Sequence, residues 1–165
     1  GLVDVIKNKD EEFIVNALRL IEPNIKDFVL SKNDVLVDIG LDKRIPINMM
    51  GDGARKILSI LTSIYECKNG IVLIDELSNG FHYSVMKGVW TSIVSVAKKN
   101  NVQIFATTHD LDSIKGLRDA AMSCEEYNNS IVCFKLHRTD NSELKSYQYS
   151  LDSVDYSLNQ EIEIR

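Results

Sequence analysis

Two short apolar runs, each ending abruptly in polar side chains, constrain the fold of this chain more than any other feature of its sequence. The first run, residues 71–74, is Ile-Val-Leu-Ile and leads directly into Asp75 and Glu76. The second run, residues 102–107, ends in a Thr-Thr-His-Asp sequence at residues 107–110. Continuous rather than alternating hydrophobicity is typical of strands that are buried on both faces, as in a parallel sheet. We therefore expect both runs to be buried parallel strands.

The segment between the two runs, residues 84–100, has the apolar spacing of a helix. Strand, helix and strand in this order predict a βαβ unit. We expect an α/β fold whose sheet is largely parallel and flanked by helices. The further elements expected are a helical stretch over residues 11–28 that breaks near Pro23, a β-hairpin over residues 35–47, an amphipathic helix that ends near residue 65, a helix over residues 111–122, and a terminal β-hairpin formed by residues 130–136 and 146–150.

Composition restricts the class of protein. The chain has 165 residues, 44% of them hydrophobic, which is enough to bury the core of one domain. Its formal net charge of −5 argues against a strongly basic nucleic-acid-binding surface. No apolar run approaches the ~18 residues that span a bilayer, and the first ten residues contain no signal-peptide core. The cysteines are odd in number and widely spaced, as expected for reduced thiols in a cytoplasmic protein: Cys67, Cys124 and Cys133.

The polar residues that follow the two strands are the first candidate site, because ligands gather at the carboxyl ends of strands in open parallel sheets. Asp75 could reach a hydrated Mg²⁺, which favours one or two carboxylates together with phosphate oxygens. Glu76 could polarise an attacking water, and His109 could donate a hydrogen bond to a terminal phosphate. The alternative is that the two acids merely end a strand and that the histidine is a structural residue.

A second candidate site precedes the amphipathic helix. Gly51, Asp52 and Gly53 leave backbone N–H groups open at a helix N-terminus, which suits an anion. Arg55 and Lys56 add positive charge in the first turn. The alternative is a simple N-cap in which Asp52 accepts backbone N–H groups.

Taken together and in order, these motifs resemble the C-terminal half of ABC-like ATPases, in particular the OLD-like and RecF/SMC-like branch often labelled AAA-family. Residues 50–55 resemble the signature motif, residues 71–76 Walker B, residues 77–82 the D-loop region, and residues 106–110 the switch-histidine motif. Residues 161–165 also resemble the end of such ATPases. The resemblance implies that residues 1–165 are the C-terminal portion of a single ATPase domain, the C-terminal lobe of a P-loop NTPase.

The resemblance also implies roles for individual residues. In this family two heads sandwich ATP, with Walker A and Walker B from one head and the signature from the other. Asp75 would hold Mg²⁺, Glu76 would act as the general base on water, and His109 would sense the γ-phosphate. The residues that would close over the partner's nucleotide are Gly51, Asp52, Gly53 and Arg55.

Two departures from the family pattern matter. Gly51 stands where the signature usually has serine. The chain also contains no G-x-x-x-x-G-K-[ST] sequence, so we expect it to bind nucleotide weakly by itself. We expect the upstream, Walker A half to be a partner, together with a second copy of the chain. In the full system a nucleic acid or an effector protein is a further candidate partner, and a membrane is not.

Two other functions stay open at this point. The chain could be a binding or dimerisation module that does not hydrolyse ATP. It could also be a Toprim-like, metal-dependent nuclease, in which Glu76 at one strand end and Asp110 and Asp112 at the next would hold the metal.

Overall fold

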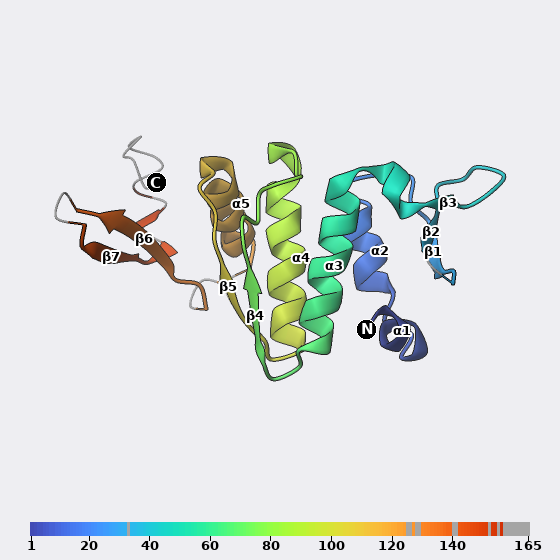
Figure 1. The fold of residues 1–165 in the computed structure, drawn as a ribbon, viewed down its shortest axis with the longest axis horizontal. Helices are drawn as coiled ribbons and strands as arrows, with labels where there is room; N and C mark the ends of the chain where they lie inside the picture. The colour runs from blue at the N-terminus through green and yellow to red at the C-terminus, as the bar shows by residue number, and fades with distance from the viewer. Residues whose placement is uncertain are drawn as a thin grey trace.

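The computed structural model describes residues 1–32, 34–124, 127, 130–139, 142–151, 153, 154 and 156. The C-terminal sequence at residues 161–165, compared above with the end of related ATPases, lies outside these residues. Figure 1 shows the helices packed beside one another, with a small sheet at one end of the molecule and a hairpin at the other.

The elements in chain order are α1 (Leu2–Lys7), α2 (Glu12–Leu18), β1 (Asp27–Leu30), β2 (Val35–Asp38), β3 (Ile45–Pro46), the 3₁₀ turn η1 (Ile47–Met50), α3 (Asp52–Glu66), β4 (Ile71–Ile74), the 3₁₀ turn η2 (Tyr83–Val85), α4 (Met86–Lys99), β5 (Gln103–Ala106), α5 (Leu111–Met122), β6 (Cys133–Arg138) and β7 (Leu144–Tyr149).

The core lies between α2, α3 and α4. Along α3, apolar side chains recur every three or four residues, so one face of the helix is apolar. Ala54, Ile57, Leu61 and Ile64 on that face are fully buried. Each buried Ile or Leu contributes about 1.5–3 kcal/mol to folding, and this packing fixes the position of the N-terminus of α3.

Strands β4 and β5 pair in parallel, from Ile71 opposite Gln103 to Ile74 opposite Ala106, and α4 connects them. The predicted βαβ unit is therefore confirmed. In the part of the chain that the structure describes, this parallel sheet has two strands, fewer than a largely parallel sheet implies.

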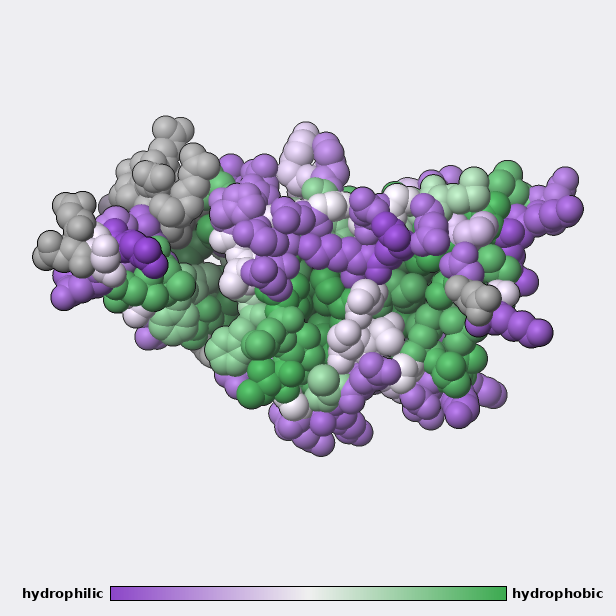
Figure 2. Space-filling model, in the orientation of Figure 1, coloured by the Kyte–Doolittle hydropathy of each residue, from purple (hydrophilic) through white to green (hydrophobic). Residues whose placement is uncertain are grey.

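The prediction that β4 and β5 are buried on both faces is wrong for both strands. Val72 and Ile74 join the core, whereas the alternate residues Ile71 and Leu73 are 58% and 77% exposed. Phe105 on β5, opposite Leu73, is also exposed. The physical reason is that helices pack on one face of this pair of strands and the described residues leave the other face bare. Figure 2 shows the resulting hydrophobic surface in the region of β4 and β5.

The N-terminal sheet is antiparallel, in the order β1-β2-β3. The predicted hairpin is confirmed as β2 and β3, but the helical assignment up to residue 28 is wrong, since α2 ends at Leu18 and Phe28 lies in β1. Pro23 breaks the helix, and the N–H of Lys26 then donates to the carbonyl of Asp38 on β2. Phe28 is buried in β1, and its spacing also fits the apolar face of a helix, so spacing alone could not distinguish the two.

The terminal hairpin is confirmed as β6 and β7, which pair from Cys133 opposite Tyr149 to Arg138 opposite Leu144. It carries exposed apolar side chains, Phe134 and Leu136 among them. The predicted unpaired cysteines are free thiols. Among the described residues, no helix combines the length and apolar character needed to span a bilayer.

Candidate functional site

The polar ends of β4 and β5 lie at the same end of the molecule as the start of α3 and the start of α5 (Figure 1). Pairing continues past the strands, because the N–H of Thr107 donates to the carbonyl of Ile74 at 2.9 Å and the N–H of Leu77 donates to the carbonyl of Thr107 at 3.0 Å. These bonds hold Asp75 and Glu76 directly beside the segment that leads to His109. The structure therefore brings together the acidic pair and the histidine singled out in the sequence.

Asp75 and Glu76 share one hydroxyl group. The hydroxyl of Thr107 donates to Oδ1 of Asp75 at 2.6 Å. The hydroxyl oxygen of Thr107, Oγ1, also accepts the backbone N–H of Glu76 at 3.0 Å. One carboxylate oxygen of Asp75 is therefore hydrogen-bonded within the protein. The residue as a whole is exposed to solvent.

The backbone of Glu76 adopts a left-handed conformation, with a φ of 48°. A residue with a Cβ takes this conformation at a cost of order 1–3 kcal/mol, so the surroundings must hold it. The ammonium group of Lys56 on α3 donates to the carbonyl oxygen of Glu76 at 2.6 Å. Burial lowers the pKa of Lys56, and the negative charges of Glu76 and Asp75 oppose that shift.

The side chain of Glu76 meets His109. Nδ1 of the histidine lies 2.6 Å from Oε2 of the glutamate. Oε2 is shielded from solvent, and no described residue donates a hydrogen bond of acceptable angle to it, so the contact with His109 is a close approach rather than an aligned hydrogen bond. The imidazole itself is 73% exposed. A shielded carboxylate oxygen beside an exposed imidazole can exchange a proton with a molecule that arrives from solvent.

The loop after Glu76 contacts the segment that follows β5. Ser78 is buried, and its hydroxyl lies 3.1 Å from that of Thr108. The side chain of Asp110 accepts the N–H of Asp112 at 3.1 Å and so caps α5. Within the described ranges, no three His, Cys, Asp or Glu side chains gather as a metal cluster. Asp110 and Asp112 therefore do not gather with Glu76 into the cluster that the nuclease alternative expects.

The glycine loop lies at the N-terminus of α3. Gly51, with a φ of 86°, takes the N-cap position, and Asp52 is the first helical residue. The prediction of Asp52 as N-cap is wrong, because its carboxylate pairs with Arg55 rather than with backbone N–H groups. Gly51, Asp52 and Arg55 are exposed. Gly53 is buried, and a Cβ atom on it would lie 2.8 Å from the carbonyl oxygen of Gly80.

Two of these contacts were not predicted from the sequence. The sequence identifies Lys56 only as a positive charge near the helix start, and Thr107 only as a polar residue at a strand end. The tandem threonines at residues 107 and 108 were the available signal, since a hydroxyl group at a strand end can bridge neighbouring carboxylates.

The donor set at this edge suits Mg²⁺. Asp75 is exposed and adjacent to Glu76, so the edge offers one or two carboxylates. Mg²⁺ is usually held in this way, with water and substrate phosphate oxygens completing its shell.

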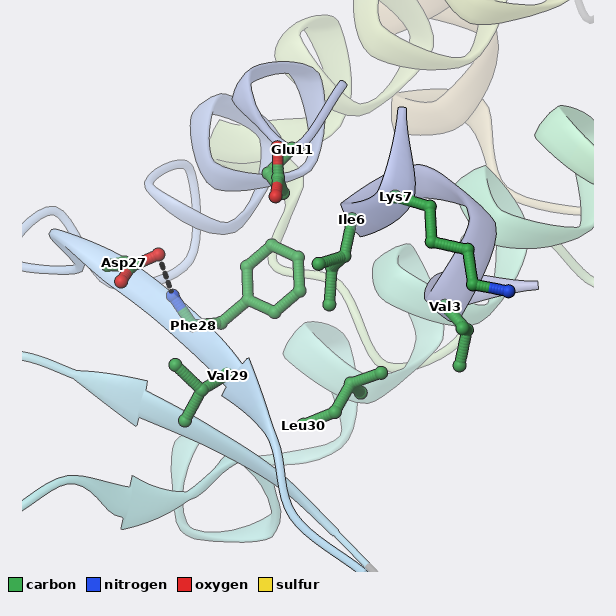
Figure 3. A pocket seen from close by; sticks show the side chains of 8 residues that line it. All are labelled: Val3, Ile6, Lys7, Glu11, Asp27, Phe28, Val29 and Leu30. Carbon is green, nitrogen blue, oxygen red and sulfur yellow. Dashed lines mark hydrogen bonds between the residues drawn. The ribbon is translucent and has the colours of Figure 1, made fainter. Parts of the chain in front are cut away.

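A hollow elsewhere on the molecule does not belong to this site. It has a volume of about 410 Å³ and lies between α1 and β1. Figure 3 shows the ring of Phe28 turned toward Ile6, while the amine of Lys7 points away. In Figure 1, α3 and α4 separate this region from β4 and β5.

Comparison with known families gives one match that spans most of the chain. A family model described as an AAA ATPase domain matches residues 3–113. The matched region contains both the glycine loop and the strand ends just described, and it stops before the β6–β7 hairpin.

Individual relatives are more distant. An ATP/GTP phosphatase of Helicobacter pylori is 26% identical over 159 residues, an alignment that covers 93% of this chain and 43% of that protein. The chain thus spans less than half the length of this relative. An uncharacterized protein of Methanocaldococcus jannaschii is 35% identical over 107 residues, which cover 64% of this chain and 89% of the relative.

A solved structure from work on the ATP-driven dimerization and DNA-stimulated activation of SMC ATPases has the same fold. Its TM-score is 0.57 at 13% identity, with 97% of this chain and 98% of that chain covered. The chain therefore has an SMC ATPase-like α/β fold.

Proposed function

We propose that this chain, which belongs to the AAA ATPase domain family, supplies the Walker B strand and the switch histidine of an ABC-type, OLD-like ATPase. The observation that carries the proposal is the contact between Glu76 and His109 at the carboxyl ends of two parallel strands, with Asp75 alongside. The terminal phosphate of a nucleotide bound at this edge would meet a base, a hydrogen-bond donor and a metal-binding carboxylate within one small region.

Each residue has a distinct role in this proposal. The carboxylate of Glu76 accepts a proton from the attacking water. The exposed imidazole of His109 donates a hydrogen bond to the γ-phosphate. Asp75 holds Mg²⁺, which when bound neutralises developing charge on the phosphate oxygens.

The glycine loop acts on the nucleotide of a second copy. Gly51 and Asp52 are exposed at the N-terminus of α3, where the helix dipole and open N–H groups favour an anion. Arg55 lies beside them and is exposed as well. The SMC ATPases of the similar structure undergo ATP-driven dimerization, and we propose that this chain dimerises in the same way, around ATP and Mg²⁺.

The bare face of β4 and β5 accommodates the half of the domain that carries Walker A. A parallel sheet is normally covered on both faces, yet Ile71, Leu73 and Phe105 face outward. An apolar patch of this kind marks an interaction site. We propose that residues 1–165 form the C-terminal portion of one ATPase domain whose upstream half packs on this face.

Leu73→Lys in the complete protein tests the assembly. It should abolish ATP turnover because a charge then lies where the upstream half packs. Leu41→Lys is the matched control, since Leu41 is also exposed but lies in the turn between β2 and β3, far from the site. Turnover that is equal in both variants would contradict the proposed assembly. ATP-dependent dimerisation without turnover in the unmodified protein would instead favour the non-hydrolysing module.

A further inference from the structure

We infer that Thr107 is a positioning residue that sets the orientation of the Asp75 carboxylate and the backbone of Glu76. The inference rests on the proposed function, because it concerns the same strand ends. It adds a residue to which the fold and the motifs assigned no role.

The direction of each hydrogen bond at Thr107 follows from the donors available. A hydroxyl group has one hydrogen to donate and two lone pairs to accept. The Glu76 N–H is a donor, so Oγ1 of Thr107 accepts it at 3.0 Å. An ionised Asp75 is an acceptor only, so the single hydroxyl hydrogen of Thr107 goes to Oδ1 of Asp75 at 2.6 Å. One side chain thereby links the carboxylate proposed to hold the metal to the residue proposed to act as base.

Thr107 itself has little freedom to move. Its N–H donates to the carbonyl of Ile74 and its carbonyl accepts the N–H of Leu77, so the backbone is paired on both sides. The hydroxyl therefore approaches Asp75 from a fixed point. A bond to Oδ1 restricts the rotation of the carboxylate. Outer partners of this kind typically change metal affinity or activity 10–100-fold when they are removed.

Glu76 keeps a second support when the Thr107 hydroxyl is removed. Lys56 still holds its carbonyl oxygen from α3. Loss of the Thr107 hydroxyl is therefore expected to disorient Asp75 first, and the characteristic effect should be on the metal rather than on folding.

The test compares four forms of the complete protein: the parent, Thr107→Val, Thr107→Ser and Thr91→Val. Thr107→Val removes the hydroxyl with little change in shape, and Thr107→Ser restores it. Thr91→Val is the matched control, because the Thr91 hydroxyl donates to the carbonyl of Lys87 on α4, away from the site. The direct readout is Mn²⁺ bound in the presence of a non-hydrolysable ATP analogue, measured by electron paramagnetic resonance. ATP turnover as a function of Mg²⁺ concentration is the second readout.

We expect the Mn²⁺ concentration for half-saturation to rise about 10-fold or more in Thr107→Val, and to remain at the parent value in Thr107→Ser and Thr91→Val. Should valine perturb the fold, Thr107→Ala removes the same hydroxyl without the bulk of valine. We expect the same rise in the Mn²⁺ concentration for half-saturation in that variant. Parent-like Mn²⁺ binding in a folded variant without the hydroxyl would overturn the inference. A parent protein that binds metal and nucleotide without hydrolysis would contradict the proposed function but leave the binding comparison valid for Thr107.

Discussion

Nδ1 of His109 lies 2.6 Å from Oε2 of Glu76, across the ends of the two parallel strands. The oxygen is shielded from solvent, whereas the imidazole is largely exposed. The side chain of Glu76 as a whole is 40% exposed. A molecule that arrives from solvent therefore meets the glutamate and the histidine side by side.

Replacing His109 with alanine should therefore lower ATP turnover in the complete protein by about 10²-fold, the usual contribution of a positioned proton-transfer or hydrogen-bonding group. The KM for ATP should change little, because the imidazole is proposed to act on the γ-phosphate in the transition state. Steady-state kinetics measure both values. His137→Ala is the control, since His137 is exposed on β6, and equal losses in the two variants would argue against a role for His109.

Gly53→Ala should destabilise the protein, whereas Gly88→Ala should not. Both glycines are helical, and alanine gains up to about 1 kcal/mol of helix propensity at each. A Cβ on Gly53 would lie 2.8 Å from the backbone oxygen of Gly80, which cannot move without shifting the loop after Glu76. The atoms nearest to a Cβ on Gly88 would be Cδ2, Cδ1 and Cγ of Leu20, a flexible side chain that can shift.

Thermal melting distinguishes these two glycines. We expect Gly53→Ala to cost roughly 1–3 kcal/mol, as other overpacked sites do, and Gly88→Ala to melt at or above the parent temperature. A Gly53→Ala variant as stable as the parent would show that the loop yields easily. A side chain at position 53 would then be tolerated beside Gly80.

Asp10 should make part of the stability depend on pH. The ammonium of Lys99 and the hydroxyl of Tyr65 both donate to its carboxylate and lower its pKa below the ordinary value of 3.8. A depressed pKa stabilises the fold above the unfolded pKa, and that stability is lost as pH falls through the folded pKa. Asp10→Asn should therefore melt below the parent at pH 7, and the difference should shrink as the pH is lowered toward and past the folded pKa. Asp42→Asn, in the exposed β2–β3 turn, is the matched control variant.

Much of the fold was predictable because its signals are local. The aliphatic run at residues 71–74 and the helical spacing after it specify a βαβ unit, and parallel strands necessarily bring their carboxyl ends together. For that reason Asp75, Glu76 and His109 were found as one group. Strand β1 was missed because Phe28 continues a helical spacing past Pro23, and only its pairing with β2 shows that it is a strand.

The exposure of Leu73 could not be predicted, since an apolar pattern records that a face is buried without saying which part of a protein covers it. The contact of Lys56 could not be predicted either, since it reaches a carbonyl oxygen of Glu76, whose left-handed backbone nothing in the residue type indicates. The tandem threonines indicate a hydroxyl group at the strand end, but not which carboxylate Thr107 bonds. The packing of Gly53 against Gly80 likewise arises from two loops that meet only in the folded chain.

The isolated chain of 165 residues should bind ATP–Mg²⁺ only weakly and should not turn it over at a useful rate. Its sequence contains no phosphate-cradling G-x-x-x-x-G-K-[ST] loop, which in P-loop enzymes supplies the amides and lysine that hold the β- and γ-phosphates. Isothermal titration calorimetry measures the affinity directly. Micromolar binding, about −8 kcal/mol, would show that residues of this chain alone form a complete nucleotide site.

The central claim is tested most directly by Glu76→Gln in the complete protein, with ATP turnover, bound nucleotide and oligomeric state measured on the same sample. Glutamine keeps the shape of the side chain but cannot accept a proton from water. We predict that turnover is abolished while ATP remains bound, and that the variant accumulates as an ATP-bound dimer in light scattering. Turnover equal to that of the parent would contradict the assignment of Glu76 as the general base, and with it the account of this site.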